Sequence, residues 1–202
     1  MKPIVFIGGH PKSGTTLLLS LLDSDPNLCV FPEEIKFFWK EMQGNHKEKI
    51  EFLTTKSDAI LPGKFNQLNP QSGFRDYSHI DSEKYTSLLT NSLTNCKNDS
   101  DYLYAIFDTY THFLSSKDFN YYVEKTPFNE FHLTSISELF PNHKIIHIIR
   151  DPRDNYLSYK KLHPNLNLLS FCTNWKKSTK IAIQNASNPN YLTITYEDLV
   201  LN

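Results

Sequence analysis

A glycine-rich stretch near the start of the chain has the residue types of an anion-binding loop. In FIGGHPKSGTTLLL, residues 6–19, a short apolar run meets a glycine pair, and a leucine-rich segment follows the polar residues. These polar residues are Lys12, Ser13, Gly14, Thr15 and Thr16. A loop between a strand and a helix aims several backbone N–H groups at one point, and the helix dipole adds partial positive charge. The stretch therefore predicts a site for a phosphate-like anion, although an ordinary strand-to-helix turn remains the alternative.

The position of Lys12 distinguishes this loop from that of an ATP-binding protein. In an ATP-binding loop the lysine directly follows a glycine and is itself followed by the hydroxyl residue that binds the metal. Here the lysine lies two residues before Gly14. The loop therefore favours an anion other than the magnesium complex of ATP.

A second candidate anion site lies in IIHIIRDPRDNYLSYKK, residues 145–161. Arg150 follows the most apolar strand-like run, and ligands of open parallel sheets gather at the carboxyl ends of the strands. Its planar guanidinium suits a phosphate, and Ser158 can add a hydroxyl to the same anion. A surface ion pair between Arg150 and Asp151 is the alternative. Two separate anion sites would indicate a ligand with phosphates at two ends.

Together, PKSGTT and the Arg150–Ser158 pair resemble the two nucleotide-binding elements of sulfotransferases that use 3′-phosphoadenosine 5′-phosphosulfate (PAPS). The resemblance implies PAPS as the sulfuryl donor and no metal. It implies that the first loop, residues Lys12 to Thr16, holds the 5′-phosphosulfate, with Lys12 near the bridging oxygen. Arg150 and Ser158 would hold the 3′-phosphate.

Two further segments resemble the same family. FPEEIKFF, residues 31–38, is similar to the glutamate-bearing segment of Golgi-type sulfotransferases that act on heparan sulfate, and more distantly to that of the tyrosylprotein enzymes. VEKTPFNEF, residues 123–131, resembles the segment whose lysine lies beside the transferred sulfuryl group. The resemblance implies Glu34 as the catalytic base, with Glu33 as the alternative, and implies that Lys12 and Lys125 stabilise the sulfuryl oxygens. A solvated glutamate pair and a salt-bridged surface lysine are the competing interpretations.

The function that this resemblance implies is in-line transfer of a sulfuryl group from PAPS to a hydroxyl or amine of a small-molecule or carbohydrate acceptor. A small-molecule kinase of the P-loop type and a nucleotide-binding module without turnover are the alternatives. One departure concerns the cytosolic branch of the family, in which a histidine base follows a Lys-Thr pair. Here the pair Lys125-Thr126 is followed by Pro127.

The pattern of apolar residues predicts the strands and helices that would position these residues. Short apolar runs predict strands at 4–7, 28–31, 121–124, 144–149 and 191–195. Between them, helices are expected at 15–22, 82–96, 101–115, 131–140, 154–161 and 168–186, with another opening at 34–42. Strands that alternate with helices predict an α/β fold with a parallel five-stranded sheet flanked by helices. The resemblance to sulfotransferases implies that this fold is similar to that of P-loop nucleotide kinases. His147, inside an apolar run, is expected in the core.

The 202 residues fit one domain, residues 1–202. A loop-rich insertion around 43–80, with one helix near 47–54, is expected on the acceptor side, where Lys64, Phe65, Phe74, Arg75 and Tyr77 could line a cleft. The chain stops at YEDLVLN, where another helix begins, so we expect a fold that is incomplete at its C-terminus.

The overall charge and the cysteines narrow the class of protein. The net charge of −1 gives no field for nucleic acid, and no apolar run approaches the roughly 18 residues of a membrane span. Three widely spaced cysteines form neither a disulfide framework nor a metal pattern. We expect a cytoplasmic protein or the soluble catalytic domain of a longer one.

Overall fold

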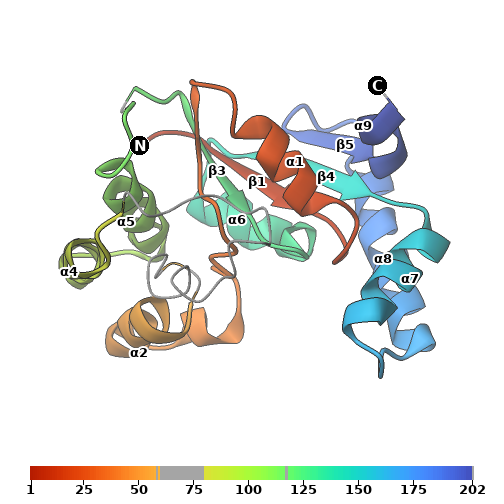
Figure 1. The fold of residues 1–202 in the computed structure, drawn as a ribbon, viewed down its shortest axis with the longest axis horizontal. Coiled ribbons are helices and arrows are strands. Elements are labelled where there is room, and N and C mark those ends of the chain that lie inside the picture. The colour runs from red at the N-terminus through yellow and green to blue at the C-terminus, as the bar shows by residue number, and fades with distance from the viewer. Residues whose placement is uncertain (58, 60–79, 117, 202) are drawn as a thin grey trace.

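The computed structural model describes residues 1–57, 59, 80–116 and 118–201 (Figure 1). Its centre is a sheet of five strands: β1 (Ile4–Gly8), β2 (Leu28–Val30), β3 (Tyr121–Lys125), β4 (Lys144–Ile149) and β5 (Tyr191–Thr195). The strands lie in the order β2-β3-β1-β4-β5, and every neighbouring pair is parallel. The predicted α/β fold with a five-stranded parallel sheet is therefore confirmed.

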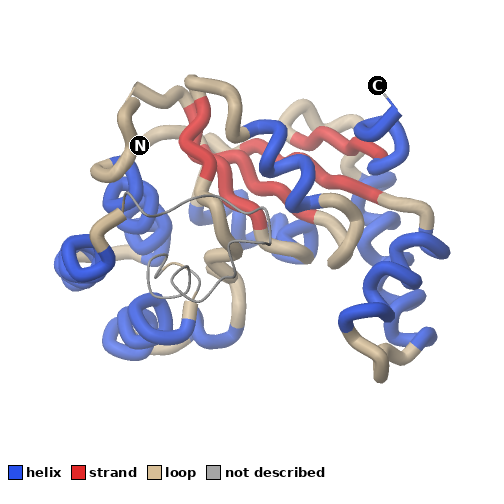
Figure 2. The backbone as a smooth tube through the Cα atoms, in the orientation of Figure 1, coloured by secondary structure: helices blue, strands red, loops and turns tan. Residues whose placement is uncertain are grey.

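Helices connect the strands and cover the sheet (Figure 2). The described α-helices are α1 (Thr15–Leu22), α2 (His46–Glu51), α4 (Ser82–Thr94), α5 (Asp99–Thr111), α6 (Leu133–Leu139), α7 (Pro152–Leu162), α8 (Leu168–Gln184) and α9 (Tyr196–Leu201). Shorter helical turns are η1 (Lys40–Gln43), η2 (Phe52–Lys56) and η4 (Asn129–His132). In Figure 1, α1 crosses in front of the sheet and α6 lies behind it.

Both faces of the sheet are apolar because both are packed. In β1, Ile4 and Phe6 belong to the larger core cluster, which includes residues of α4, α5 and α6. Val5 and Ile7 point the other way and pack with Leu18 and other residues of α1. All five residues of β1 are buried, which explains why the strand reads as a continuous apolar run rather than an alternating one.

The prediction of a helix that opens at 34–42 is wrong. Within that range only residues from Lys40 onward are helical, in η1. Lys36 has a φ of 59°, in the left-handed region that stops a right-handed helix. Its backbone N–H donates to the hydroxyl of Thr126, 3.1 Å away. A tertiary hydrogen bond therefore overrides the helical tendency of this segment.

The insertion around 43–80 is described only in part. The helix expected near 47–54 is confirmed by α2 and η2. The residues suggested as lining a cleft, Lys64, Phe65, Phe74, Arg75 and Tyr77, lie outside the described residues.

Candidate functional site

A cleft of about 630 Å³ lies at the edge of the sheet where β1, β3 and β4 end. Most of the residues predicted for the site line it, namely Lys12, Gly14, Thr15, Thr16, Glu34, Arg150 and Ser158. They come from three stretches of the chain, which follow β1, β2 and β4. The carboxyl ends of parallel strands meet at one edge of a sheet, which brings these stretches together. Two predicted residues do not line the cleft. Lys125 contacts Glu34, and Ser13 is buried within the loop.

The loop after β1 has a backbone that depends on glycine. Gly14 has a φ of 107°, and a Cβ atom there would lie 2.5 Å from the Tyr196 ring. Gly14 is also the N-cap of α1, whose first turn contains no acidic residue. The positive end of this helix therefore points into the cleft without an internal counter-charge, which suits an anionic ligand.

Two buried donors at this site have no hydrogen-bond partner among the described residues. They are Ser13 Oγ and Arg150 Nε. A buried polar group without a partner is costly, so such groups are normally satisfied by something else. Arg150 lines the cleft, so an anionic ligand is a natural partner for its Nε atom, whereas Ser13 lies behind the lining residues. The side chains present therefore fit a ligand that carries phosphate or sulfate groups.

Arg150 connects the two predicted anion sites. Its Nη1 atom donates to the carbonyl of Lys12 at 3.2 Å, and its guanidinium lies 4.2 Å from the centre of the Tyr196 ring. The indole of Trp175 donates to the Arg150 carbonyl at 3.1 Å. The guanidinium is thus fixed between the loop and an aromatic ring.

A surface pair between Arg150 and Asp151, the competing interpretation of this stretch, is not formed. Asp151 instead pairs with Arg153, whose Nη2 atom lies 2.6 Å from its carboxylate. The hydrogen bonds from Arg153 lower the pKa of Asp151. Arg153 is exposed and does not line the cleft, so the two arginines of RDPR have separate roles.

The glutamate and lysine of the other two matched segments meet at the cleft wall. Lys125 Nζ donates to Glu34 Oε1 at 2.8 Å. The lysine side chain is 6% exposed and the glutamate side chain 30%, so the pair is half-buried rather than a surface salt bridge. Glu34 lines the cleft and Glu33 does not, which favours Glu34 of the two adjacent candidates.

Sequence reasoning missed a buried carboxylate beside this pair. Glu124 is fully buried, and it accepts hydrogen bonds from the hydroxyl of Thr126 and from Asn129 Nδ2. Burial raises its pKa to about 7. Because Thr126 also accepts the N–H of Lys36, this carboxylate supports the segment that carries Glu34. The sequence did carry a signal of this role. Glu124 lies inside a predicted buried strand, and a charged side chain buried there must have polar partners.

A second carboxylate, Glu130, was also missed. Its Oε2 atom accepts the backbone N–H of Gly9 at 2.7 Å, directly at the start of the anion-binding loop. The side chain is buried, and its Oε1 atom accepts the hydroxyl of Ser178 in α8 and lies 3.9 Å from His147 Nε2 in β4. No local pattern could reveal those contacts.

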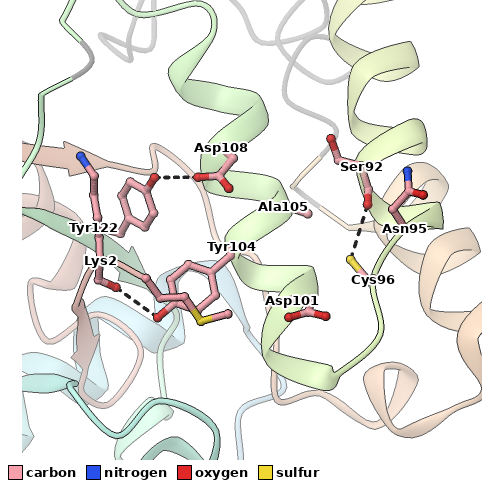
Figure 3. A pocket seen from close by; sticks show the side chains of 10 residues that line it. Lys2, Ser92, Asn95, Cys96, Asp101, Tyr104, Ala105, Asp108 and Tyr122 are labelled. Atoms are coloured by element: carbon pink, nitrogen blue, oxygen red, sulfur yellow. Dashed lines mark hydrogen bonds between the residues drawn. The ribbon is translucent and has the colours of Figure 1, made fainter.

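Another cleft, of about 660 Å³, lies at the opposite edge of the sheet, where β1 and β3 begin (Figure 3). Its tyrosines have partners within the chain: Tyr122 donates to Asp108 at 2.7 Å, and Tyr104 donates to the Lys2 carbonyl at 3.1 Å. It contains none of the predicted site residues. We therefore assign the candidate site to the carboxyl edge.

Two features are absent from the part of the chain that the structure describes. There, no group of three or more His, Cys, Asp or Glu residues is arranged to hold a metal ion. None of the helices described is both long enough and apolar enough to cross a membrane.

Solved structures share this fold. The sulfotransferase domain of the olefin synthase of Synechococcus PCC 7002 is 22% identical, with a TM-score of 0.67 over 98% of this chain and 68% of that one. A sulfotransferase from Alicyclobacillus acidocaldarius is 16% identical, with a TM-score of 0.53 over 100% of this chain and 76% of that one. At such low identity these similarities concern the fold alone.

Sequence comparisons agree. Protein-tyrosine sulfotransferase 1 of Danio rerio is 26% identical over 207 aligned residues, which cover 98% of this chain and 49% of that protein. The chain thus spans about half the length of this curated relative. The model of the sulfotransferase family matches residues 3–202. The chain belongs to the sulfotransferase family.

Proposed function

We propose that the protein transfers a sulfuryl group from PAPS to a hydroxyl or amine of a small-molecule or carbohydrate acceptor. Family membership supports this reaction class. The observation that carries the proposal is the convergence in one cleft of two anion-binding elements and a carboxylate–lysine pair.

The donor-binding residues follow from the two anion-binding elements. Lys12, Thr15 and Thr16, together with the N-terminus of α1, would bind the 5′-phosphosulfate. Arg150 and Ser158 would bind the 3′-phosphate. When bound, PAPS supplies an activated sulfuryl group attached to a phosphate leaving group.

The catalytic roles fall to Glu34 and two lysines. Glu34 would accept the proton of the acceptor hydroxyl or amine as the acceptor atom bonds to sulfur. Lys12 and Lys125 would neutralise the charge that builds on the bridging oxygen and on the sulfuryl oxygens. Lys125 already lies 2.8 Å from Glu34, so both groups can reach the same reacting centre. No step in this scheme requires a metal.

The acceptor would enter between Glu34 and the aromatic side chains that line the cleft, Trp39, Phe128 and Tyr159. Flat apolar rings of this kind suit a sugar or an aromatic ring next to the reacting hydroxyl. The Danio rerio relative is, by its name, a sulfotransferase of protein tyrosine. A tyrosine peptide therefore belongs in the acceptor screen beside carbohydrates.

Calorimetry with 3′-phosphoadenosine 5′-phosphate (PAP) tests the donor assignment, with ADP plus Mg²⁺ as the competing ligand. We expect the wild type to prefer PAP and Arg150→Ala to lose at least about tenfold in affinity, as removal of a charge-assisted phosphate contact predicts. Arg153→Ala is the matched control, because this neighbouring arginine is paired with Asp151 outside the cleft.

Other outcomes would overturn the proposal in distinct ways. Equal binding of ADP–Mg²⁺, or equal losses in the two arginine variants, would favour the small-molecule kinase. Binding of PAP without turnover of PAPS on hydroxyl and amine acceptors would favour a nucleotide-binding module that lacks catalysis.

A further inference from the structure

Behind the anion-binding loop, four polar side chains form a continuous buried row. They are Glu130 of η4, Ser178 of α8, His147 of β4 and Tyr191 of β5. Their exposed fractions lie between 0% and 6%, and none of them lines the cleft. The expected core position of His147 is confirmed, but its contacts are polar.

Each member of the row contacts the next within hydrogen-bond distance. The Tyr191 hydroxyl lies 2.6 Å from His147 Nδ1, and His147 Nε2 lies 2.9 Å from Ser178 Oγ. Ser178 Oγ lies 2.6 Å from Glu130 Oε1, and the N–H of Gly9 donates to Glu130 Oε2 at 2.7 Å. The row therefore runs from the sheet edge at β5 to the first residue of the loop.

The hydrogens of the row can be assigned from its chemistry. Burial lowers the pKa of His147 to about 4, so near neutral pH the ring carries a single N–H. Burial raises the pKa of Tyr191, so its phenol keeps its hydrogen and donates to Nδ1. The histidine hydrogen then lies on Nε2 and is donated to Ser178, whose own hydrogen is donated to Glu130. Burial raises the pKa of Glu130, whereas the hydrogen bonds from Ser178 and Gly9 favour its charged form. In that form each hydrogen of the row makes one bond, and the carboxylate of Glu130 accepts from both Ser178 and Gly9.

Both backbone groups of Gly9 are used by this arrangement. Its N–H donates to Glu130, and its carbonyl accepts the N–H of Phe128 at 3.0 Å. The carboxylate is also packed tightly, since a Cβ atom on Gly8 would lie 2.8 Å from Glu130 Oε2. The loop thus leaves β1 in a direction set by Glu130, and the residues that face the ligand follow within seven positions.

We propose that Glu130 is the positioning residue of the anion-binding loop, and that Ser178, His147 and Tyr191 hold its carboxylate in place. Residues that touch no ligand then determine how well the loop binds the donor. The part of this inference that concerns donor affinity rests on the proposed function. The part that concerns the position of Gly9 does not.

Two variants remove the support in different ways. Ser178→Ala leaves Glu130 Oε1 without its donor, whereas Glu130→Gln replaces the charged acceptor of the Gly9 N–H by a neutral one. Tyr191→Phe is a milder variant at the far end of the row. Its matched control is Tyr122→Phe, which removes another buried phenol–side-chain hydrogen bond at the opposite edge of the sheet (Figure 3).

Amide hydrogen exchange at Gly9, measured without any ligand, is the first readout. We expect exchange to be at least about tenfold faster in Ser178→Ala and Glu130→Gln than in the wild type, because the N–H loses a strong acceptor. The second readout is calorimetric affinity for PAP, which should weaken about fivefold to tenfold in the same variants. In Tyr191→Phe both changes should be smaller, and in Tyr122→Phe both should be absent. KM for the acceptor should stay constant throughout.

A purely structural role gives a different result. If Ser178→Ala and Glu130→Gln lower the melting temperature as Tyr122→Phe does, yet leave Gly9 exchange and PAP affinity within about twofold of the wild type, the proposal is overturned. If those two variants do not fold, Tyr191→Phe decides by the same measurements. If the wild type does not bind PAP but Gly9 exchange accelerates as expected, the proposed function fails and the positioning role stands.

Discussion

Lys125 and Glu34 form an ion pair at the wall of the cleft, with Nζ 2.8 Å from Oε1. The lysine comes from the end of β3, whereas the glutamate comes from the non-helical segment that follows β2. In the proposed reaction, this contact lets the lysine and the carboxylate act on the same substrate atoms. A bound sulfuryl group would compete with Glu34 for Lys125. Once the lysine moves to the sulfuryl oxygens, the carboxylate is available to the acceptor.

The two adjacent glutamates should differ sharply in their effect on turnover. We expect Glu34→Gln to lower kcat about 10²-fold to 10⁴-fold, the usual contribution of a general base, with little change in PAP affinity. Glu33→Gln should keep kcat near the wild-type value, because Glu33 does not line the cleft. Steady-state kinetics on both variants decides the assignment, and the reverse ranking would make Glu33 the base.

Thr126 should matter through its hydroxyl alone. Thr126→Val removes the donor to Glu124 and the acceptor of the Lys36 N–H, and so loosens the segment that carries Glu34. We expect kcat to fall about tenfold, as loss of precise placement implies, while PAP affinity is retained. Thr126→Ser keeps the hydroxyl and should restore most of kcat. Equal kcat values for the two variants would show that the hydroxyl has no such role.

Gly14 should tolerate no side chain. Gly14→Ala forces a left-handed φ on alanine and drives its Cβ into the Tyr196 ring, so the free energy of unfolding should fall by about 1–3 kcal/mol or more. Gly44→Ala is the control, because its φ of −74° suits alanine and its close contacts are side-chain atoms of Glu48, whose movement costs only the hydrogen bond from the Asn45 N–H. Urea unfolding of both variants measures the difference, and equal losses would contradict the steric argument.

Glu124 should make stability depend on pH in a predictable direction. Its pKa rises from 4.5 in the unfolded chain to about 7 in the folded protein because burial disfavours the charge. Between these values the folded state binds more protons, so this group lowers the free energy of unfolding as pH rises.

Across that window the contribution lost from Glu124 is on the order of 3 kcal/mol, and above it the loss is constant. We therefore expect Glu124→Gln to gain stability relative to the wild type as pH increases through the window. Urea unfolding at a series of pH values tests this, and parallel curves for the two proteins would refute it.

Much of the fold followed from local pattern. β1 and β4 are short apolar runs bounded by glycine, proline or polar residues, and β1, which is packed on both faces, shows no alternation, so such runs are easy to recognise. Arg150, which follows the most apolar of these runs, lines the cleft. Local sequence was sufficient for features that depend on a single segment of the chain.

Local sequence pattern failed where the conformation or burial of a residue depends on contacts with distant residues. The segment after Glu34 looked helical, but a hydrogen bond from Lys36 to Thr126, 90 positions away, holds it in another conformation. Glu124 and Glu130 were not among the residues predicted for the site. Their burial depends on partners such as Ser178, which lies 48 positions from Glu130 and is brought there only by the sheet.

The strand order β2-β3-β1-β4-β5 has a consequence for how the protein is made. β1 is the central strand and the first to be synthesised, but its neighbours β3 and β4 come much later in the chain. Arg150 meets the loop across 138 positions of sequence, so the cleft closes only through contacts of long range. Such contacts form slowly, and an apolar strand waiting for its partners is prone to aggregate. We infer that the nascent chain passes through a vulnerable interval, which ends when β4 pairs with β1.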